Sequence, residues 1–245
     1  MSISIRQIIK LSILGLGALL YRNKKSKLLY YHDIHGDRQY TPMGTPLDVF
    51  KSHIEAIRKE GYQIVPRIKS NEGEVAILFD DGFRGIYDVR QVFYDEGICP
   101  TVFLAVELIG KEGYLTKEEI LELQEHGFIF ECHSWSHQDL TTFSDEELLR
   151  ELKDSKDYLS ELLGKVVTEI CLPIGYFSDH LLEQIKKYDY KEVYSSVPGD
   201  YNDLVNGMMR PRHLLQYASP CEVRYILRGG NNLLKSHYEK LHHKG

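Results

Sequence analysis

Short apolar segments alternate along the chain with longer segments of helical periodicity. The apolar segments contain many β-branched or aromatic side chains, as buried strands do. We expect strands at residues 28–31, 75–79, 101–106, 128–132, 169–172 and 192–195. We expect helices at residues 47–59, 116–125, 145–163 and 179–187. Ser144, followed by Glu147, has the form of a capping box that opens the third of these helices. This alternation predicts an α/β fold on a parallel sheet or barrel.

Two short polar clusters follow predicted strands. Asp80 and Asp81 come directly after residues 75–79, at the end of the strand where α/β folds place their chemistry. Two adjacent carboxylates are costly there unless a positive charge joins them. His133 and His137 follow the strand at residues 128–132, and on one helical turn their imidazoles would share a face. Two histidines and one carboxylate leave coordination positions open, as catalytic metal sites do.

Each cluster also has an ordinary interpretation when it is taken alone. Asp-Asp-Gly suits a turn, because aspartate and glycine fit turn geometry. Two histidines four residues apart are more often surface or capping residues than a pair of ligands. Their joint occurrence, each after an apolar strand in an alternating chain, favours the metal site.

Three motifs in the chain resemble those of the polysaccharide deacetylases of carbohydrate esterase family four. Residues 77–82 read Ile-Leu-Phe-Asp-Asp-Gly, residues 133–137 read His-Ser-Trp-Ser-His, and residues 170–175 read Ile-Cys-Leu-Pro-Ile-Gly. The resemblance implies a single-domain distorted (β/α) barrel of about seven strands that removes acetyl groups from N-acetylated sugars. It assigns Asp81, His133 and His137 as metal ligands and Asp80 as the catalytic base.

The acid histidine of this family usually lies near the C-terminus, and no clean strand ending in histidine is found there. Residues 27–33 instead form an apolar strand that ends in His32-Asp33. This order resembles the circularly permuted deacetylases that act on poly-N-acetylglucosamine. On that resemblance His32 is the catalytic acid, and a structural histidine at a strand end is the alternative.

A further difference concerns the cation that braces the base. In the commonest form of the family an arginine stands two residues before the proline of the third motif, where this chain has Cys171. The segment around Arg212 resembles the Leu-Pro-Arg segment of the permuted subgroup, so Arg212 is the candidate for orienting Asp80. Arg210 and His213 are rivals, and a plain surface charge is a further alternative.

The expected reaction is amide hydrolysis. A bound metal ion lowers the pKa of its water toward about 7 and polarises the acetyl carbonyl, while Asp80 takes the proton of the water and His32 protonates the sugar nitrogen. The family resemblance places one backbone N–H of the turn formed by Pro173, Ile174 and Gly175 at the oxyanion. Sugars stack on aromatic rings, so Trp135 and Tyr176 are candidates for sugar contacts. Packing beneath the loops is an equal alternative for each of the two side chains.

Composition limits the class of protein further. The 245 residues, 42% hydrophobic with a net charge of −6, suit one globular domain, assigned to residues 27–245. The mild acidity argues against a nucleic-acid partner. The four cysteines form neither a zinc pattern nor a disulfide framework, and Cys132 and Cys171 are expected to be buried.

Residues 1–26 form a separate hydrophobic and basic segment. Residues 11–21 are an apolar run, too short to span a bilayer unless the span extends to residues 3–21. The basic residues after the run argue against translocation. We therefore expect an uncleaved membrane anchor or interfacial helix with the enzyme on the cytoplasmic face; the alternative is a cleaved signal and export to the cell envelope.

The hypothesis is thus a metal-dependent N-deacetylase acting on a glycan or glycolipid. Zinc fits two histidines and one aspartate, and cobalt, nickel or iron are tolerated. The alternatives are an O-acetyl esterase on a polysaccharide and a glycan-binding protein on a degenerate barrel.

Overall fold

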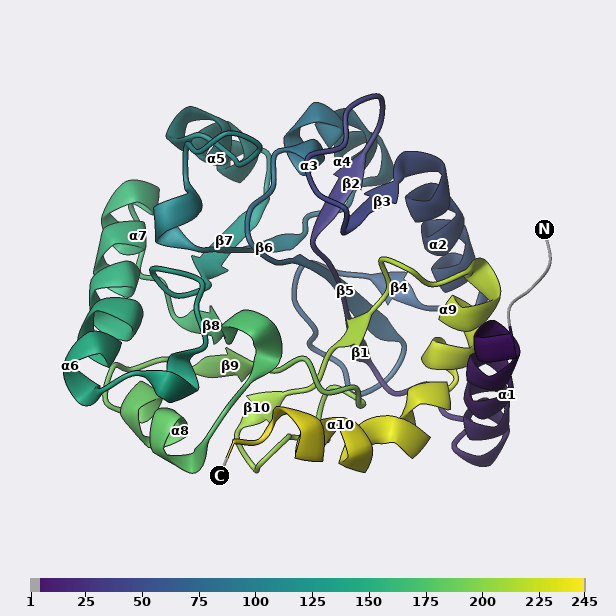
Figure 1. Cartoon of the computed structure of the whole chain (residues 1–245). Coiled ribbons are helices and arrows are strands. Elements are labelled where there is room, and N and C mark those ends of the chain that lie inside the picture. The colour runs from purple at the N-terminus through teal and green to yellow at the C-terminus, as the bar shows by residue number, and fades with distance from the viewer. Residues whose placement is uncertain (1–4, 245) are drawn as a thin grey trace.

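Six buried parallel strands form the centre of the molecule in the computed structural model, which describes residues 5–244. They pair side by side in the order β1, β5, β6, β7, β8 and β9 (Figure 1). Their bounds are β1 (Lys27–Tyr31), β5 (Glu74–Phe79), β6 (Thr101–Leu104), β7 (Ile129–Cys132), β8 (Glu169–Cys171) and β9 (Glu192–Tyr194). All these pairings are parallel, which brings the carboxyl ends of the strands to one side of the sheet.

One further segment closes the curled sheet. Its first part, β10 (Met209–Arg210), pairs with β9, and its last part, β11 (His213–Leu214), pairs with β1. Pro211 and Arg212 lie between the two parts, and Arg212 N–H donates to the Val197 carbonyl at 2.9 Å. The predicted distorted barrel is confirmed, and with this segment counted once the main ring has seven strands. The short β4 (Gln63–Ile64) also pairs with β5, while β2 (Asp33–His35) pairs with β3 (Gly44–Pro46).

Helices surround the barrel (Figure 1). Their bounds are α2 (Leu47–Lys59), α3 (Gly85–Asp88), α4 (Arg90–Glu96), α5 (Lys117–Glu125), α6 (Asp145–Leu148), α7 (Ser155–Leu163), α8 (Asp179–Lys186), α9 (Pro220–Leu227) and α10 (Lys235–His242). Short 3₁₀ turns are η1 (Val106–Leu108), η2 (Leu140–Thr142), η4 (Pro173–Gly175) and η5 (Gly230–Leu234), and η3 (Leu149–Asp154) is a π-helical segment. The four predicted helices are present at nearly the predicted bounds.

Two predicted elements differ in detail from the structure. The strand expected at residues 101–106 ends at Leu104, because Val106 begins the 3₁₀ turn η1. The helix expected at residues 145–163 is interrupted by the π segment η3 between α6 and α7. Its predicted start is confirmed, since Ser144 and Glu147 form a reciprocal capping box.

The N-terminal helix α1 (Ile5–Leu20) lies against α9 and η5 (Figure 1). Gly17 faces Gly230 so closely that a Cβ on Gly17 would lie 2.2 Å from the Gly230 carbonyl oxygen. The Lys10 ammonium forms an ion pair with Glu222 of α9 at 2.7 Å. Residues 1–4 of the predicted N-terminal segment, and Gly245, lie outside the described residues. Within residues 5–244, the helices are all too short or too polar to cross a bilayer.

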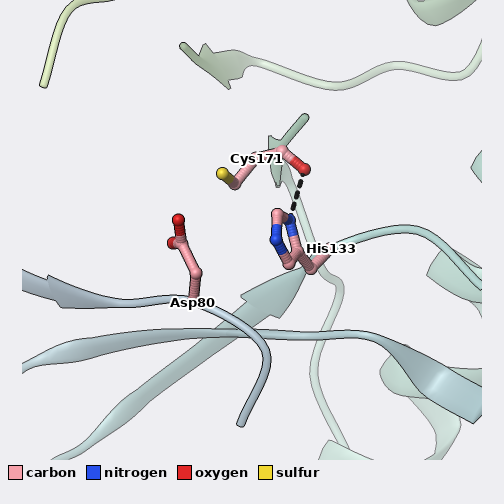
Figure 2. Close-up of side chains that lie close together, drawn as sticks. All are labelled: Asp80, His133 and Cys171. Carbon is pink, nitrogen blue, oxygen red and sulfur yellow. Dashed lines mark hydrogen bonds between the residues drawn. The ribbon is translucent and has the colours of Figure 1, made fainter. Parts of the chain in front are cut away.

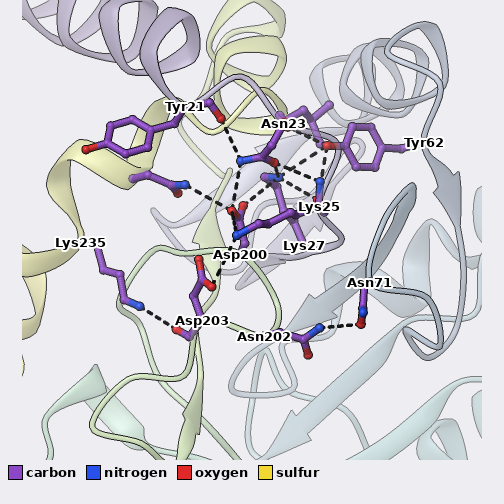
Figure 3. Close-up of polar contacts among 12 residues, drawn as sticks. Tyr21, Asn23, Lys25, Lys27, Tyr62, Asn71, Asp200, Asn202, Asp203 and Lys235 are labelled. Atoms are coloured by element: carbon purple, nitrogen blue, oxygen red, sulfur yellow. Dashed lines mark hydrogen bonds and ion pairs between the residues drawn. The ribbon is translucent and has the colours of Figure 1, made fainter.

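A buried polar network fixes the link between α1 and β1 (Figure 3). Lys27 Nζ lies 2.9 Å from Asp200 Oδ1, and both side chains are almost fully buried. Asn23 donates to Asp200 Oδ2 at 3.1 Å and accepts from Lys27 at 3.0 Å, while Asn232 of η5 donates to the same Asp200 oxygen at 3.3 Å. Burial lowers the pKa of Lys27, and the adjacent Asp200 carboxylate opposes that change. The network therefore ties the segment after α1 and the turn η5 to Asp200.

Candidate metal and catalytic site

The two predicted polar clusters meet at the carboxyl ends of the strands. Asp80 and Asp81 follow β5, and His133 follows β7. His137 Nε2 lies 2.8 Å and His133 Nε2 lies 3.3 Å from Asp81 Oδ1. Ligand atoms of all three residues lie within 4.8 Å of one another. The structure thus brings together the three predicted metal ligands, beside the predicted base.

The histidines do not lie on a helical turn, so that part of the prediction is wrong. Residues 133–137 form a loop in which Ser134 and His137 have positive φ angles of 66° and 59°. Ser134 Oγ accepts a hydrogen bond from the His137 backbone N–H at 3.2 Å. Helical spacing was predicted to bring the two imidazoles together. Left-handed backbone at these two positions instead turns both imidazoles toward Asp81.

Glu151 holds this loop from the π segment η3. Its Oε2 accepts the backbone N–H groups of Trp135 at 3.0 Å and Ser136 at 2.9 Å. Glu151 is buried. Removal of its carboxylate would leave both N–H groups without this acceptor. Glu151 could not be identified from the sequence, because it belongs to the polar pattern of an ordinary helix and the π turn aims it at the loop.

The substitution Glu151→Ala tests this support. We expect metal affinity to fall about 10- to 100-fold, as it does when groups that orient ligands are removed. We expect unfolding free energy to fall by about 1–3 kcal/mol, because two partly buried donors lose their partner. Metal titration and chemical denaturation measure the two effects, with the exposed Glu161→Ala on α7 as control. Unchanged metal affinity in Glu151→Ala would show that the loop holds its shape alone.

The hydrogen bonds of His133 test whether the three residues suit a cation. His133 Nδ1 lies 2.8 Å from the Cys171 backbone carbonyl, which only accepts, so Nδ1 carries the hydrogen. In the neutral ring Nε2 is then a lone pair, and it faces Asp81 Oδ1, a buried oxygen with no hydrogen-bond partner among the described residues. Two acceptors that face each other suit a shared cation. A carbonyl that fixes the tautomer of a ligating histidine is also usual in metal sites.

The charges of the three residues agree with this interpretation. Burial would raise the pKa of Asp81, but the adjacent His133 and His137 hold it far below its usual value. Burial would lower the pKa of His137, and the Asp81 carboxylate raises it instead. Asp81 is therefore ionised, and a metal ion would compete with a proton for His137.

Arg212 braces Asp80, as the sequence analysis proposed. Its two terminal nitrogens donate to Asp80 Oδ1 at 2.7 Å and Oδ2 at 2.9 Å, and both side chains are buried. Burial would raise the pKa of Asp80, but the guanidinium holds it below its usual value. The rival Arg210 instead forms a paired contact with Glu192, and the buried His213 contacts Asn231 at 3.1 Å. The surface-charge alternative for Arg212 is wrong.

Cys171 lies beside Asp80 and His133. Figure 2 shows its sulfur and the Asp80 carboxylate pointing toward one another, with the His133 ring next to them. Ligand atoms of these three residues also lie within 4.8 Å of one another. They suit a metal less well, because both Asp80 oxygens already accept from Arg212 and burial raises the pKa of the Cys171 thiol well above its ordinary value. Cys132 and Cys171 are buried free thiols, as predicted.

His32 follows β1 and lines the same cavity as Asp80 and Asp81. Its Nδ1 lies 2.5 Å from Gln216 Oε1, so the amide oxygen fixes the hydrogen on Nδ1. Nε2 is then the atom that remains for chemistry. Gln216, in the loop after β11, was not found from the sequence, because its link to His32 depends on the closing segment.

The third motif forms the 3₁₀ turn η4 at the rim of the site. Ile174 lines the cavity with a left-handed φ of 61°, and Gly175 N–H donates to the Leu172 carbonyl at 3.2 Å. Tyr176 does not line the cavity: its ring lies 6.0 Å from that of His242 and beneath the Lys244 ammonium. Trp135 also packs away from the cavity, between Tyr158 and Arg150.

The site opens into a cavity of about 560 Å³. At one end it is lined by Asp80, Asp81, His32, His133 and His137. This volume lies within the range of small-molecule pockets, roughly 300–1,000 Å³. Candidate base, acid and metal ligands thus share one space that accommodates a substrate.

Comparison with known proteins gives a consistent result. A protein-family model described as polysaccharide deacetylase matches residues 67–193. YxkH of Bacillus subtilis (strain 168), which is named for the same family, is 27% identical over 186 residues, 71% of this chain and 66% of YxkH. The peptidoglycan-N-acetylmuramic acid deacetylase PdaA of the same organism is 26% identical over 131 residues, 52% of this chain and 48% of PdaA. The chain therefore spans less than two thirds of the length of these curated relatives.

A solved structure shares the fold. The Streptococcus pyogenes deacetylase PplD, in complex with acetate, has a TM-score of 0.73 and 22% sequence identity to this chain. The match covers 83% of this chain and 98% of PplD.

Proposed function

The chain belongs to the polysaccharide deacetylase family, and we propose that it hydrolyses acetamido groups on N-acetylated sugars with one divalent metal ion. The observation that carries the proposal is the meeting of two carboxylates with different partners in one cavity. Asp81 faces His133 and His137, whereas Asp80 faces Arg212. Two adjacent acids in different surroundings can take different roles.

The metal site in this proposal is made by Asp81, His133 and His137. A divalent ion bound there would polarise the acetyl carbonyl and lower the pKa of a water molecule toward about 7. Zinc suits this ligand set, and cobalt, nickel or iron are alternatives.

Asp80 is the proposed general base. Arg212 keeps its carboxylate ionised and fixed in orientation, since both oxygens accept from the same guanidinium. Each oxygen of a carboxylate has a further lone pair. Asp80 therefore takes a proton from the attacking water without losing its contact with Arg212.

His32 is the proposed general acid. Gln216 holds the hydrogen on Nδ1, so the proton that Nε2 carries in the imidazolium is the one delivered to the sugar nitrogen. Protonation of that nitrogen is needed because an unprotonated amine is a poor leaving group. A positioned acid of this kind contributes typically about 10²- to 10⁴-fold to the rate.

The Ile174 backbone N–H is the proposed oxyanion donor in the turn at Pro173–Gly175. Proline has no N–H, and the Gly175 N–H already donates to the Leu172 carbonyl. Ile174 lines the cavity and has the left-handed backbone that reorients a peptide group. A donor fixed before the reaction stabilises the negative oxygen of the tetrahedral intermediate.

Acetate release from N-acetylglucosamine oligomers and from O-acetylated sugars tests this proposal. We expect metal-supplied protein to release acetate from the N-acetylated sugars, and a chelator to remove most of that activity. Release from O-acetylated sugars alone would favour an esterase. Binding of one metal ion per chain without release from either class would favour a glycan-binding protein.

A further inference from the structure

The cavity continues beyond the candidate site into an apolar region. Its wall there comes from segments at both ends of the chain, which pack against each other. We call this region the apolar arm. Its apolar side chains are Leu14 of α1, Leu214 of β11, Tyr217 and Ala218 of the following loop, Ile226 of α9 and Leu234 of η5. Two polar side chains of α1 and η5 also line the cavity, but Lys10 already pairs with Glu222 and Asn231 with His213. The helix α1 is therefore part of the wall of the substrate cavity as well as an N-terminal appendage.

The segments that form the arm also carry most of the exposed large hydrophobic side chains. Of the 15 exposed large hydrophobic side chains among residues 9–244, ten lie in residues 9–21 and 214–241. Single exposed apolar residues are normal on a protein, whereas a concentration in the segments that form one cavity suggests an apolar ligand. Two of the ten, Leu214 and Tyr217, also line the arm.

The apolar arm suits a polysaccharide chain poorly. Each sugar unit beyond the reacting one brings hydroxyl groups, and burial of hydroxyls against leucine and isoleucine costs free energy when no partner is present. A hydrocarbon chain has no such requirement, and its transfer from water to the arm is favourable.

We infer that the cavity takes an amphipathic substrate, an N-acetylated sugar that carries a hydrocarbon chain. The sugar lies at the end lined by Asp80, Asp81 and His32, and the hydrocarbon chain lies in the apolar arm between β11, α9, η5 and α1. The inference rests on the proposed deacetylase function for its sugar end, and the apolar arm determines the substrate class, a glycolipid.

Alkyl glycosides of N-acetylglucosamine test the inference with the full chain. Each methylene group that enters the arm tightens binding by up to about fourfold, which corresponds to about 0.8 kcal/mol. We expect KM for acetate release to fall more than about tenfold from the methyl to the octyl glycoside, below the micellar concentration. We expect kcat to change little, because the chain lies away from the reacting bond and adds uniform binding.

A pair of matched variants locates the effect. Leu214→Asn places a polar amide in the arm, and we expect the octyl-to-methyl ratio of kcat/KM to fall about three- to tenfold. Leu204 is equally exposed, at 38%, but does not line the cavity, so Leu204→Asn should keep the ratio of the unaltered chain. Equal losses in both variants would overturn the inference.

Direct calorimetric binding of both glycosides separates this inference from the proposed function. Acetate release that is the same for methyl and octyl glycosides, or that improves only with added sugar units, would overturn the glycolipid assignment and keep the deacetylase. Binding that tightens with alkyl length, with no acetate released, would keep the amphipathic ligand and overturn the deacetylase. Neither binding nor release would overturn both.

Discussion

Replacement of Asp80 by asparagine is expected to lower kcat for acetate release by about 10²- to 10⁴-fold, the usual contribution of a general base. Asparagine keeps the shape of the side chain but does not take a proton from water. Metal binding should remain at one ion per chain, because Asp81, His133 and His137 are unchanged. Steady-state acetate assays and metal titration measure the two results.

The control must account for stability, because Asp80→Asn also leaves the Arg212 charge buried without its partner. Asp200→Asn makes the same kind of change elsewhere, since it removes the carboxylate that pairs with the buried Lys27. Breaking a buried pair typically costs about 3–5 kcal/mol, so both variants should lose stability. Only Asp80→Asn should lose turnover. A kcat within about tenfold of the unaltered chain would show that Asp80 is not the base.

Much of the site could be predicted because parallel strands end at the same edge of a sheet. Asp80 follows one such strand and His133 another, so the strand pattern places both at that edge. The alternation of apolar and amphipathic segments likewise predicted a parallel sheet or barrel, and the family resemblance favoured the barrel. The local sequence was therefore sufficient to predict those features of the site that depend on where the strands end.

The remaining features depend on contacts between distant segments. Glu151 supports the histidine loop through a π turn that a helical pattern does not reveal. Three basic residues within residues 210–213 were rivals for Asp80, and only the path of the closing segment between β9 and β1 selects Arg212. The apolar arm needs the close approach of Gly17 and Gly230, which are far apart in sequence.

Arg212→Ala is expected to lower unfolding free energy by about 3–5 kcal/mol, because it leaves the Asp80 charge buried and unpaired. It should also raise the pKa of Asp80, since burial is then opposed only by weaker nearby charges. The base is active when ionised, so a higher pKa means that activity is lost at a higher pH. The acidic limb of kcat/KM should therefore move upward in pH. Denaturation and pH–rate profiles measure the two effects. Arg210→Ala, which breaks contacts with Glu192, Tyr201 and Asn202 but none with Asp80, should leave the profile in place.

A second substitution separates loss of the brace from general damage. Cys171 occupies the position that carries arginine in the commonest form of the family, and its sulfur points toward Asp80 (Figure 2). Cys171→Arg should therefore restore part of the activity when Arg212 is alanine. In the unaltered chain the same substitution should be harmful, because two buried guanidiniums would compete for one carboxylate. This change of sign in a double-mutant cycle requires both side chains to act on Asp80. Equal damage by Cys171→Arg in both backgrounds would show that an arginine at position 171 does not replace Arg212 as the brace of Asp80.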